Sequence, residues 1–136
     1  MIISAELLDE LIAHSREDPG NEVCGVIAVE AERPARALRV FRARNLHTSP
    51  LKFEIEPKEL LKLSNACEEL GRLGAIYHSH VRSAPYPSQT DVNFAANWPG
   101  VEWIIVGLAD GQAPHVRSYL IEAGEITETA IVESAT

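Results

Sequence analysis

Residues 23–29, with the sequence Val-Cys-Gly-Val-Ile-Ala-Val, constrain the fold more than any other part of the chain. The run is short, rich in β-branched residues and almost wholly apolar, as expected of a strand covered on both faces. Such a strand needs a packed layer on each side of its sheet. We therefore expect it in the centre of a sheet that has helices against it.

Two amphipathic segments predict those helices. Ser4 precedes apolar residues at helical spacing, so it is expected to cap a first helix that ends at the Pro-Gly pair of residues 19–20. A second helix is expected between Pro57 and Gly71, because apolar residues three and four positions apart lie between them. Ser88 is expected to cap a third, short helix that extends to about residue 97.

Further strands are expected where apolar residues alternate with polar ones or form short runs, at residues 37–45, 51–55, 73–78, 103–108, 116–121 and, as a weak edge strand, 126–132. The polar segment 30–36, which contains Pro34, is expected to be a loop. Strands and helices alternate irregularly rather than in regular βαβ units. The order favours an α+β fold, a three-layer arrangement of helices around a mixed central β-sheet.

Composition bounds the class of protein. With 136 residues, 46% hydrophobic and 24% charged, the chain fits one globular domain over residues 1–136. The net charge of −8 argues against a nucleic-acid partner. No apolar run approaches the roughly 18 residues of a membrane span, and no secretory signal begins the chain. Two cysteines are too few for a disulfide framework, so we expect a cytoplasmic protein.

Three side chains in the centre of the sequence have the pattern of a metal site. If His78 and His80 lie at a strand end, the two-residue period places both imidazoles on one face. Asp91, in the first turn of the third helix, could fold back as a third ligand. Two histidines and one carboxylate leave the fourth tetrahedral position free, which is typical of catalytic rather than structural zinc.

Each half of this pattern has an ordinary structural explanation. An HxH pair is often found on a surface or in a core without metal, and Ser88-x-x-Asp91 is close to a capping box. Their joint occurrence is more specific, because seven residues separate His80 from Ser88 and this loop can bring the helix start to the strand end. Ser88 can cap the helix while Asp91 binds the metal.

The run from His78 to Asp91 resembles the signature of the JAMM (MPN+, Mov34/PAD-1) zinc metallopeptidases. The upstream glutamate of that signature is matched by Glu22, in the sequence Glu-Val-Cys-Gly. The resemblance extends over nearly the whole chain and implies an α/β/α domain of the MPN and cytidine-deaminase-like kind. Every position of the motif is filled, so nothing points to the inactive MPN branch that lacks metal ligands.

The resemblance implies a role for each motif residue. One Zn2+ per chain would be held by His78, His80 and Asp91, and it would activate water and polarise the scissile carbonyl. Glu22 would act as the general base and pass the proton to the leaving amine. Ser88 would donate a hydrogen bond to the oxyanion.

The resemblance also implies a substrate. Residues 76–80 and 84–91 are similar to small bacterial enzymes that release cysteine from the C-terminus of a ubiquitin-like sulfur-carrier protein. The expected reaction is hydrolysis of the amide after the carrier's C-terminal Gly-Gly, releasing cysteine or trimming the carrier. Ser49 and Phe53 are expected to bind the substrate tail, which could add to the domain as a β-strand.

Two other functions stay open at this point: a metal-dependent amidohydrolase of small molecules, and a non-catalytic binding module for a ubiquitin-like protein. Whether the chain forms a homodimer is also open. The remaining conspicuous side chains are expected to be structural. Cys24 and Cys67 should pack in the core, Trp98 and Trp103 should pack the third helix against the sheet, and the other histidines should be surface or structural residues, namely His14, His47 and His115.

Overall fold

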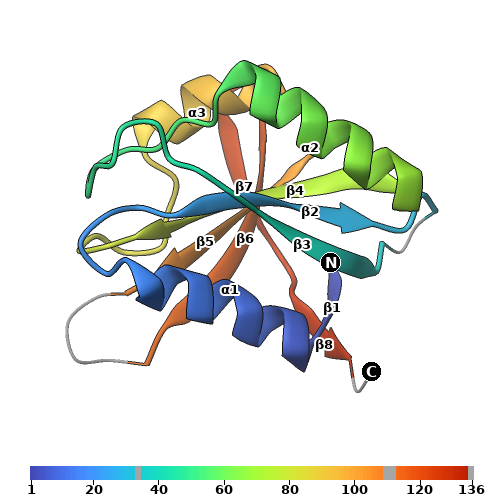
Figure 1. Cartoon of the computed structure of the whole chain (residues 1–136), viewed down its shortest axis with the longest axis horizontal. Coiled ribbons are helices and arrows are strands. Elements are labelled where there is room, and N and C mark those ends of the chain that lie inside the picture. Colours follow the sequence, from blue (N-terminus) through green and yellow to red (C-terminus); the bar gives the residue numbers. More distant parts are fainter. Residues whose placement is uncertain (33–34, 109–112, 135–136) are drawn as a thin grey trace.

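The computed structural model describes residues 1–32, 35–108 and 113–134 (Figure 1). Its elements along the chain are β1 (Ile2–Ser4), α1 (Ala5–Glu17), β2 (Cys24–Val29), β3 (Ala37–Ala43), α2 (Pro57–Leu70), β4 (Arg72–His80), α3 (Gln89–Ala95), β5 (Glu102–Gly107), β6 (His115–Glu122), β7 (Glu125–Thr129) and β8 (Val132–Ser134). In these ranges, no helix has the length and hydropathy needed to cross a membrane.

The main sheet has six strands in the order β3-β2-β4-β5-β6-β7. Only β4 and β5 run parallel, and every other neighbouring pair is antiparallel, so the sheet is mixed. All six residues of β2 are buried, which confirms the prediction of a strand covered on both faces. Cys24 on β2 pairs with His78 on β4, and this register brings the start of β2 beside the end of β4.

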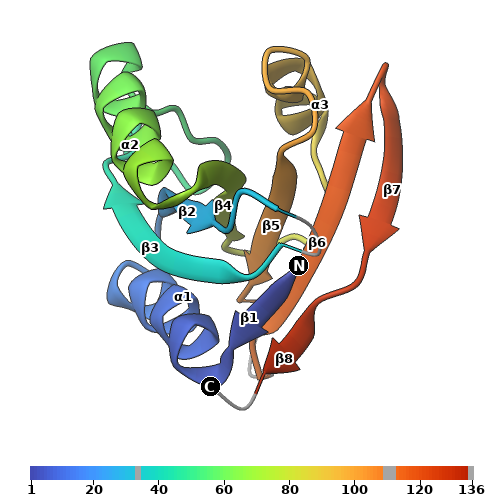
Figure 2. The ribbon, with the colours of Figure 1, turned by 90° about the vertical axis from the view of Figure 1, so that its right-hand side faces the viewer.

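Helices cover both faces of this sheet. Figures 1 and 2 show α1 on one face and α2 and α3 together on the other. The buried side chains divide accordingly. The cluster on the α1 face includes Leu11, Ile27, Tyr77 and Ile104, and the cluster on the α2 and α3 face includes Val26, Leu60, Ile76, Ala95 and Trp103. The predicted α+β fold with three layers is confirmed.

The helix boundaries follow the predicted signals. The Leu7 N–H donates to Ser4 Oγ at 3.2 Å, which makes Ser4 the N-cap of α1. Helix α1 ends at Glu17, just before the Pro-Gly pair at residues 19–20. Helix α2 starts at Pro57 and is followed by Gly71, whose N–H donates to the Cys67 carbonyl.

The expected strand at residues 51–55 is wrong. Phe53 and Ile55 are buried, as their alternation indicated, but the segment does not pair as a strand. The Asn45 side chain holds it instead: Oδ1 accepts from the Glu54 N–H at 3.1 Å and Nδ2 donates to the Lys52 carbonyl at 3.0 Å. Alternation of apolar and polar residues predicts which side chains face the core, but it does not predict strand pairing. An asparagine side chain can make the backbone hydrogen bonds that a neighbouring strand would otherwise make.

The C-terminal part differs from the prediction in one more respect. The expected edge strand at 126–132 is divided into β7, at the edge of the main sheet, and β8, which pairs in parallel with β1. The strand β1 was not predicted, because it has only three residues, the last of which is the helix cap Ser4, and so short a segment shows no periodicity. The expected loop at 30–36 lies between β2 and β3, and its residues 33–34 fall outside the described ranges.

Candidate metal centre and active site

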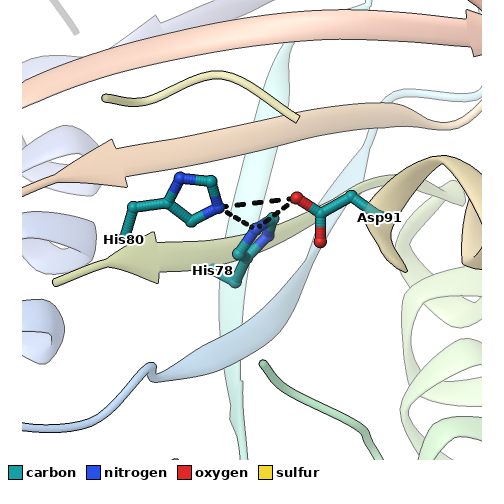
Figure 3. Close-up of side chains that lie close together, drawn as sticks. All are labelled: His78, His80 and Asp91. Atoms are coloured by element: carbon teal, nitrogen blue, oxygen red, sulfur yellow. Dashed lines mark hydrogen bonds and ion pairs between the residues drawn. The ribbon is translucent and has the colours of Figure 1, made fainter. Parts of the chain in front are cut away.

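Strand β4 and helix α3 bring the three predicted ligands together (Figure 3). His78 Nε2 lies 3.1 Å from His80 Nε2 and 3.1 Å from Asp91 Oδ2, and His80 Nε2 lies 3.5 Å from the same oxygen. All three residues are at least 96% buried. Within the described ranges they are the one group of three such side chains arranged to hold a metal ion.

The spacing of these three atoms fits a zinc ion. Tetrahedral zinc with bonds of about 2.0–2.1 Å holds its ligand atoms about 3.3 Å apart. The observed separations of 3.1, 3.1 and 3.5 Å lie around that value. Two imidazole nitrogens and one carboxylate oxygen also form a donor set that zinc prefers. The residues present therefore suit this metal.

The Asp91 carboxylate is oriented by the helix that carries it. The Asp91 N–H donates to Ser88 Oγ at 3.2 Å, and the Ser88 N–H donates to Asp91 Oδ2 at 2.9 Å, so the predicted capping box is confirmed. The same Oδ2 faces both imidazoles. Burial alone would raise the pKa of Asp91, but the two histidines and the Ser88 N–H outweigh it and hold that pKa below its usual value. The carboxylate is therefore ionised.

The two histidines are held in different ways. His80 Nδ1 lies 2.8 Å from the Ala84 carbonyl, which can only accept, so Nδ1 carries a proton and Nε2 is the nitrogen left to bind a metal. The His78 ring instead stacks on Phe53, with a centroid distance of 4.4 Å. Burial lowers the pKa of His78, so its ring is neutral. Nε2 of each ring faces Asp91 Oδ2, so these are the two nitrogens placed to bind a metal ion, which would take the position of the proton between them and the carboxylate.

Glu22 precedes β2 and is fixed through its backbone. Its N–H donates to the Ser49 carbonyl at 2.8 Å, and its own carbonyl accepts from Asn45 Nδ2 at 3.0 Å. The next residue, Val23, exchanges two hydrogen bonds with Ser79: the Val23 N–H donates to Ser79 Oγ at 2.9 Å and the Ser79 N–H donates to the Val23 carbonyl at 3.0 Å. Burial raises the pKa of the Glu22 carboxyl to about 7.

One pocket joins these groups. Glu22, His80 and Ser88 line it together with Pro50, Leu51, Arg82 and Ser83. A substrate carbonyl in this pocket would therefore meet the predicted ligand His80, a carboxylate whose pKa is near neutrality and a serine hydroxyl. This is the arrangement that hydrolysis of an amide requires.

Of the two residues expected to bind substrate, Ser49 directly precedes a residue that lines this pocket and Phe53 lies against His78, and the contacts of both are within the protein. Ser49 Oγ accepts from the Leu51 N–H at 3.1 Å, and the Ser49 carbonyl accepts from Glu22. Phe53 is only 6% exposed and lies against His78. Their role in substrate binding stays a prediction, and the structure adds that Phe53 stacks on His78, a predicted ligand.

Sequence reasoning missed two residues that shape the site, Ser79 and Asn45. Ser79 is fully buried and lies between the two histidines in the sequence, and its place near the end of a strand that contains the apolar run 73–77 is the signal that could have identified it. Asn45 holds both Glu22 and the 51–55 segment, and no sequence pattern predicts those long-range contacts.

Other conspicuous side chains have the expected structural roles. Cys24 is fully buried and unpaired, and burial raises its pKa to about 12, so its thiol is not a nucleophile. His14 Nδ1 lies 2.7 Å from the Tyr77 hydroxyl, and His47 Nε2 lies 2.8 Å from a carboxylate oxygen of Glu54. Trp103 is fully buried against Phe94 of α3.

A mixed sheet between two helical layers, with a His-His-Asp cluster at the end of a central strand and a buried glutamate beside it, defines the class of metal-dependent hydrolases. Residues 4–122 match the family described as prokaryotic homologs of the JAB domain. The chain belongs to this family, and the resemblance to JAMM metallopeptidases is confirmed.

Individual relatives of the chain support the same family assignment. The chain is 34% identical to the CysO-cysteine peptidase of Mycobacterium tuberculosis over 134 residues, covering 96% of this chain and 89% of the relative. It is 34% identical to a desampylase of Haloferax volcanii, covering 76% and 77% of the two chains. A solution structure of a Desulfitobacterium hafniense protein superposes with a TM-score of 0.87 at 29% identity, covering 100% and 94%. The chain is a hydrolase of the JAMM type.

Proposed function

We propose that the chain is a zinc metallopeptidase that hydrolyses the amide bond after the C-terminal Gly-Gly of a ubiquitin-like sulfur-carrier protein and releases cysteine. The observation that carries the proposal is the pocket in which Glu22 and Ser88 meet the metal ligand His80. The similarity to a CysO-cysteine peptidase over 96% of the chain supports the choice of substrate.

The chain's own residues would divide the chemistry as follows. Zinc, when bound, supplies a Lewis acid that polarises the scissile carbonyl and lowers the pKa of water. Glu22 takes the proton from the attacking water and delivers it to the leaving amine, and a pKa of about 7 suits both transfers. Ser88 Oγ accepts from the Asp91 N–H, so its own hydrogen is free to donate to the oxyanion.

Arg82 favours cysteine over the side chain of a protein lysine as the leaving group. It is the one arginine or lysine of the described residues that lines this pocket, and it makes no ion pair there. A cysteine joined through its α-amino group keeps a free α-carboxylate close to the scissile amide, whereas a lysine isopeptide has none. We infer that Arg82 binds that carboxylate.

Cytoplasmic location is part of the proposal. Cys24 and Cys67 are both buried and unpaired, which suits a reducing compartment. The product, free cysteine, is also stable as a thiol in such a compartment.

The decisive experiment is cleavage of a purified carrier–cysteine adduct, followed by intact mass spectrometry, with zinc quantified in the same preparation. We expect the zinc-loaded protein to remove one cysteine and the chelated protein to leave the adduct intact. Glu69→Gln, a change at an exposed glutamate that does not line the pocket, is the matched control for variants of Glu22. If the zinc-loaded protein cleaves a lysine isopeptide but not the cysteine adduct, the proposed leaving group is wrong. If the protein neither binds zinc nor cleaves the adduct, the assignment as an enzyme is wrong.

A further inference from the structure

The loop of residues 81–87 joins His80 to Ser88, and it is anchored to a strand outside the metal site. The Tyr119 hydroxyl, on β6, donates to the Pro85 carbonyl at 2.6 Å. Tyr119 is 3% exposed. The ring of Tyr86 meets the ring of Tyr119 edge to face, with a centroid distance of 5.5 Å and an interplanar angle of 80°. Two neighbouring loop residues therefore rest on one tyrosine.

A second anchor lies on β5. A Cβ atom added at Gly107 would lie 3.0–3.1 Å from three atoms of the Pro85 ring, so this ring lies directly against the strand backbone. Gly107 is also the register partner of His80 in the parallel pair β4 and β5. The glycine thus lets the loop approach the strand next to the ligand.

The anchored loop contacts the metal site through Ala84. The Ala84 carbonyl accepts from His80 Nδ1, and Ala84 directly precedes Pro85, whose carbonyl Tyr119 holds. The Tyr119 hydroxyl therefore fixes the peptide adjacent to the one that sets the His80 ring. An imidazole that donates from Nδ1 keeps its Nε2 lone pair for the metal.

We propose that Tyr119 is a positioning residue for the metal: through the Pro85 carbonyl it holds the 81–87 loop so that the Ala84 carbonyl orients His80 and raises zinc affinity. The inference rests on the proposed zinc site but not on the proposed substrate. Loss of a group that directly orients a ligand costs about 10- to 100-fold in metal affinity. Tyr119 acts one peptide further away, so we expect its loss to weaken zinc binding about 3- to 10-fold.

Tyr119→Phe is the variant that tests this. It removes one hydroxyl and keeps the ring that packs on Tyr86. Tyr86→Phe is the matched control, because Tyr86 is 54% exposed and its hydroxyl makes no hydrogen bond within the described residues. Gly107→Ala disturbs the same loop from a different strand, since its methyl group would press on Pro85.

The measurement is the zinc dissociation constant, by competition with a chromophoric chelator at a temperature where every variant is folded. We expect about 3- to 10-fold weaker binding for Tyr119→Phe, a change in the same direction for Gly107→Ala, and no change for Tyr86→Phe. Side-chain 15N spectra of the zinc-free protein should show His80 protonated at Nδ1 in the wild type and a tautomer mixture in Tyr119→Phe. If Tyr119 only stabilises the fold, Tyr119→Phe will lower the melting temperature but leave the zinc dissociation constant and the His80 tautomer unchanged.

Two results would overturn the inference. One is a Tyr119→Phe protein with wild-type zinc affinity, and the other is an equal loss of affinity in Tyr86→Phe. If Gly107→Ala does not fold, the comparison of the two tyrosine variants decides. A wild-type protein that binds no zinc would overturn the proposed metal site as well, whereas an unchanged Tyr119→Phe in a zinc-binding protein would overturn this inference alone.

Discussion

Ser79→Ala should destabilise the fold more than its size suggests. Ser79 is fully buried, and its Oγ accepts from the Val23 N–H at 2.9 Å. Alanine would leave that buried N–H without a partner, which costs about 1–3 kcal/mol. For a domain of this size, 1 kcal/mol corresponds to about 4 °C in melting temperature, so we expect a decrease of about 4–12 °C.

Ser15→Ala provides the matched comparison. Ser15 is also fully buried, but its hydroxyl donates to the Leu11 carbonyl, which already accepts a hydrogen bond within α1. Its removal leaves no backbone group unpaired, so the expected cost is below about 1 kcal/mol. Urea unfolding of zinc-free proteins measures both values. If Ser79→Ala loses no more stability than Ser15→Ala, the argument from the Val23 N–H is refuted.

Three further predictions concern the pocket. Glu22→Gln should keep stoichiometric zinc but lose at least about 100-fold in kcat, because a glutamine cannot transfer the proton; turnover equal to that of Glu69→Gln would show that the base is misassigned. His80→Ala should lose zinc, as measured by elemental analysis, and retained stoichiometric zinc would exclude it as a ligand. Arg82→Gln should lower kcat/KM about 10-fold on a carrier–cysteine adduct but not on the corresponding cysteinamide; equal losses on both substrates would contradict carboxylate binding.

The parts of the fold that the sequence predicts are those whose signals are local. The apolar run 23–29 predicted the buried strand β2, and cap residues such as Ser4 and Ser88 predicted helix starts. The two-residue period predicted that His78 and His80 share a face, and the seven-residue loop predicted that Asp91 reaches them. Each of these signals depends on residues that are close in sequence.

The contacts that the sequence could not predict join distant residues. Tyr119 lies 34 residues from Pro85, and Val23 lies 56 residues from Ser79. Periodicity tells which side chain is buried, but it does not tell which partner satisfies a buried polar group. The 51–55 segment failed as a strand for the same reason, because its partner is the side chain of Asn45 rather than another strand.

The two histidines of the proposed metal site connect it to different parts of the molecule. His78 is supported by Phe53, a 6% exposed member of the core cluster on the α2 face, so a change at Phe53 alters core packing together with the metal site. His80 contacts a carbonyl in a loop of which residues 82–84 and 86 are exposed. Core substitutions cost several kcal/mol, whereas loss of one loop hydrogen bond costs about 1 kcal/mol. If zinc binds as proposed, removing only the Tyr119 hydroxyl should therefore change zinc affinity at little cost to fold stability, whereas replacing the Phe53 ring should alter the metal site and the core packing together.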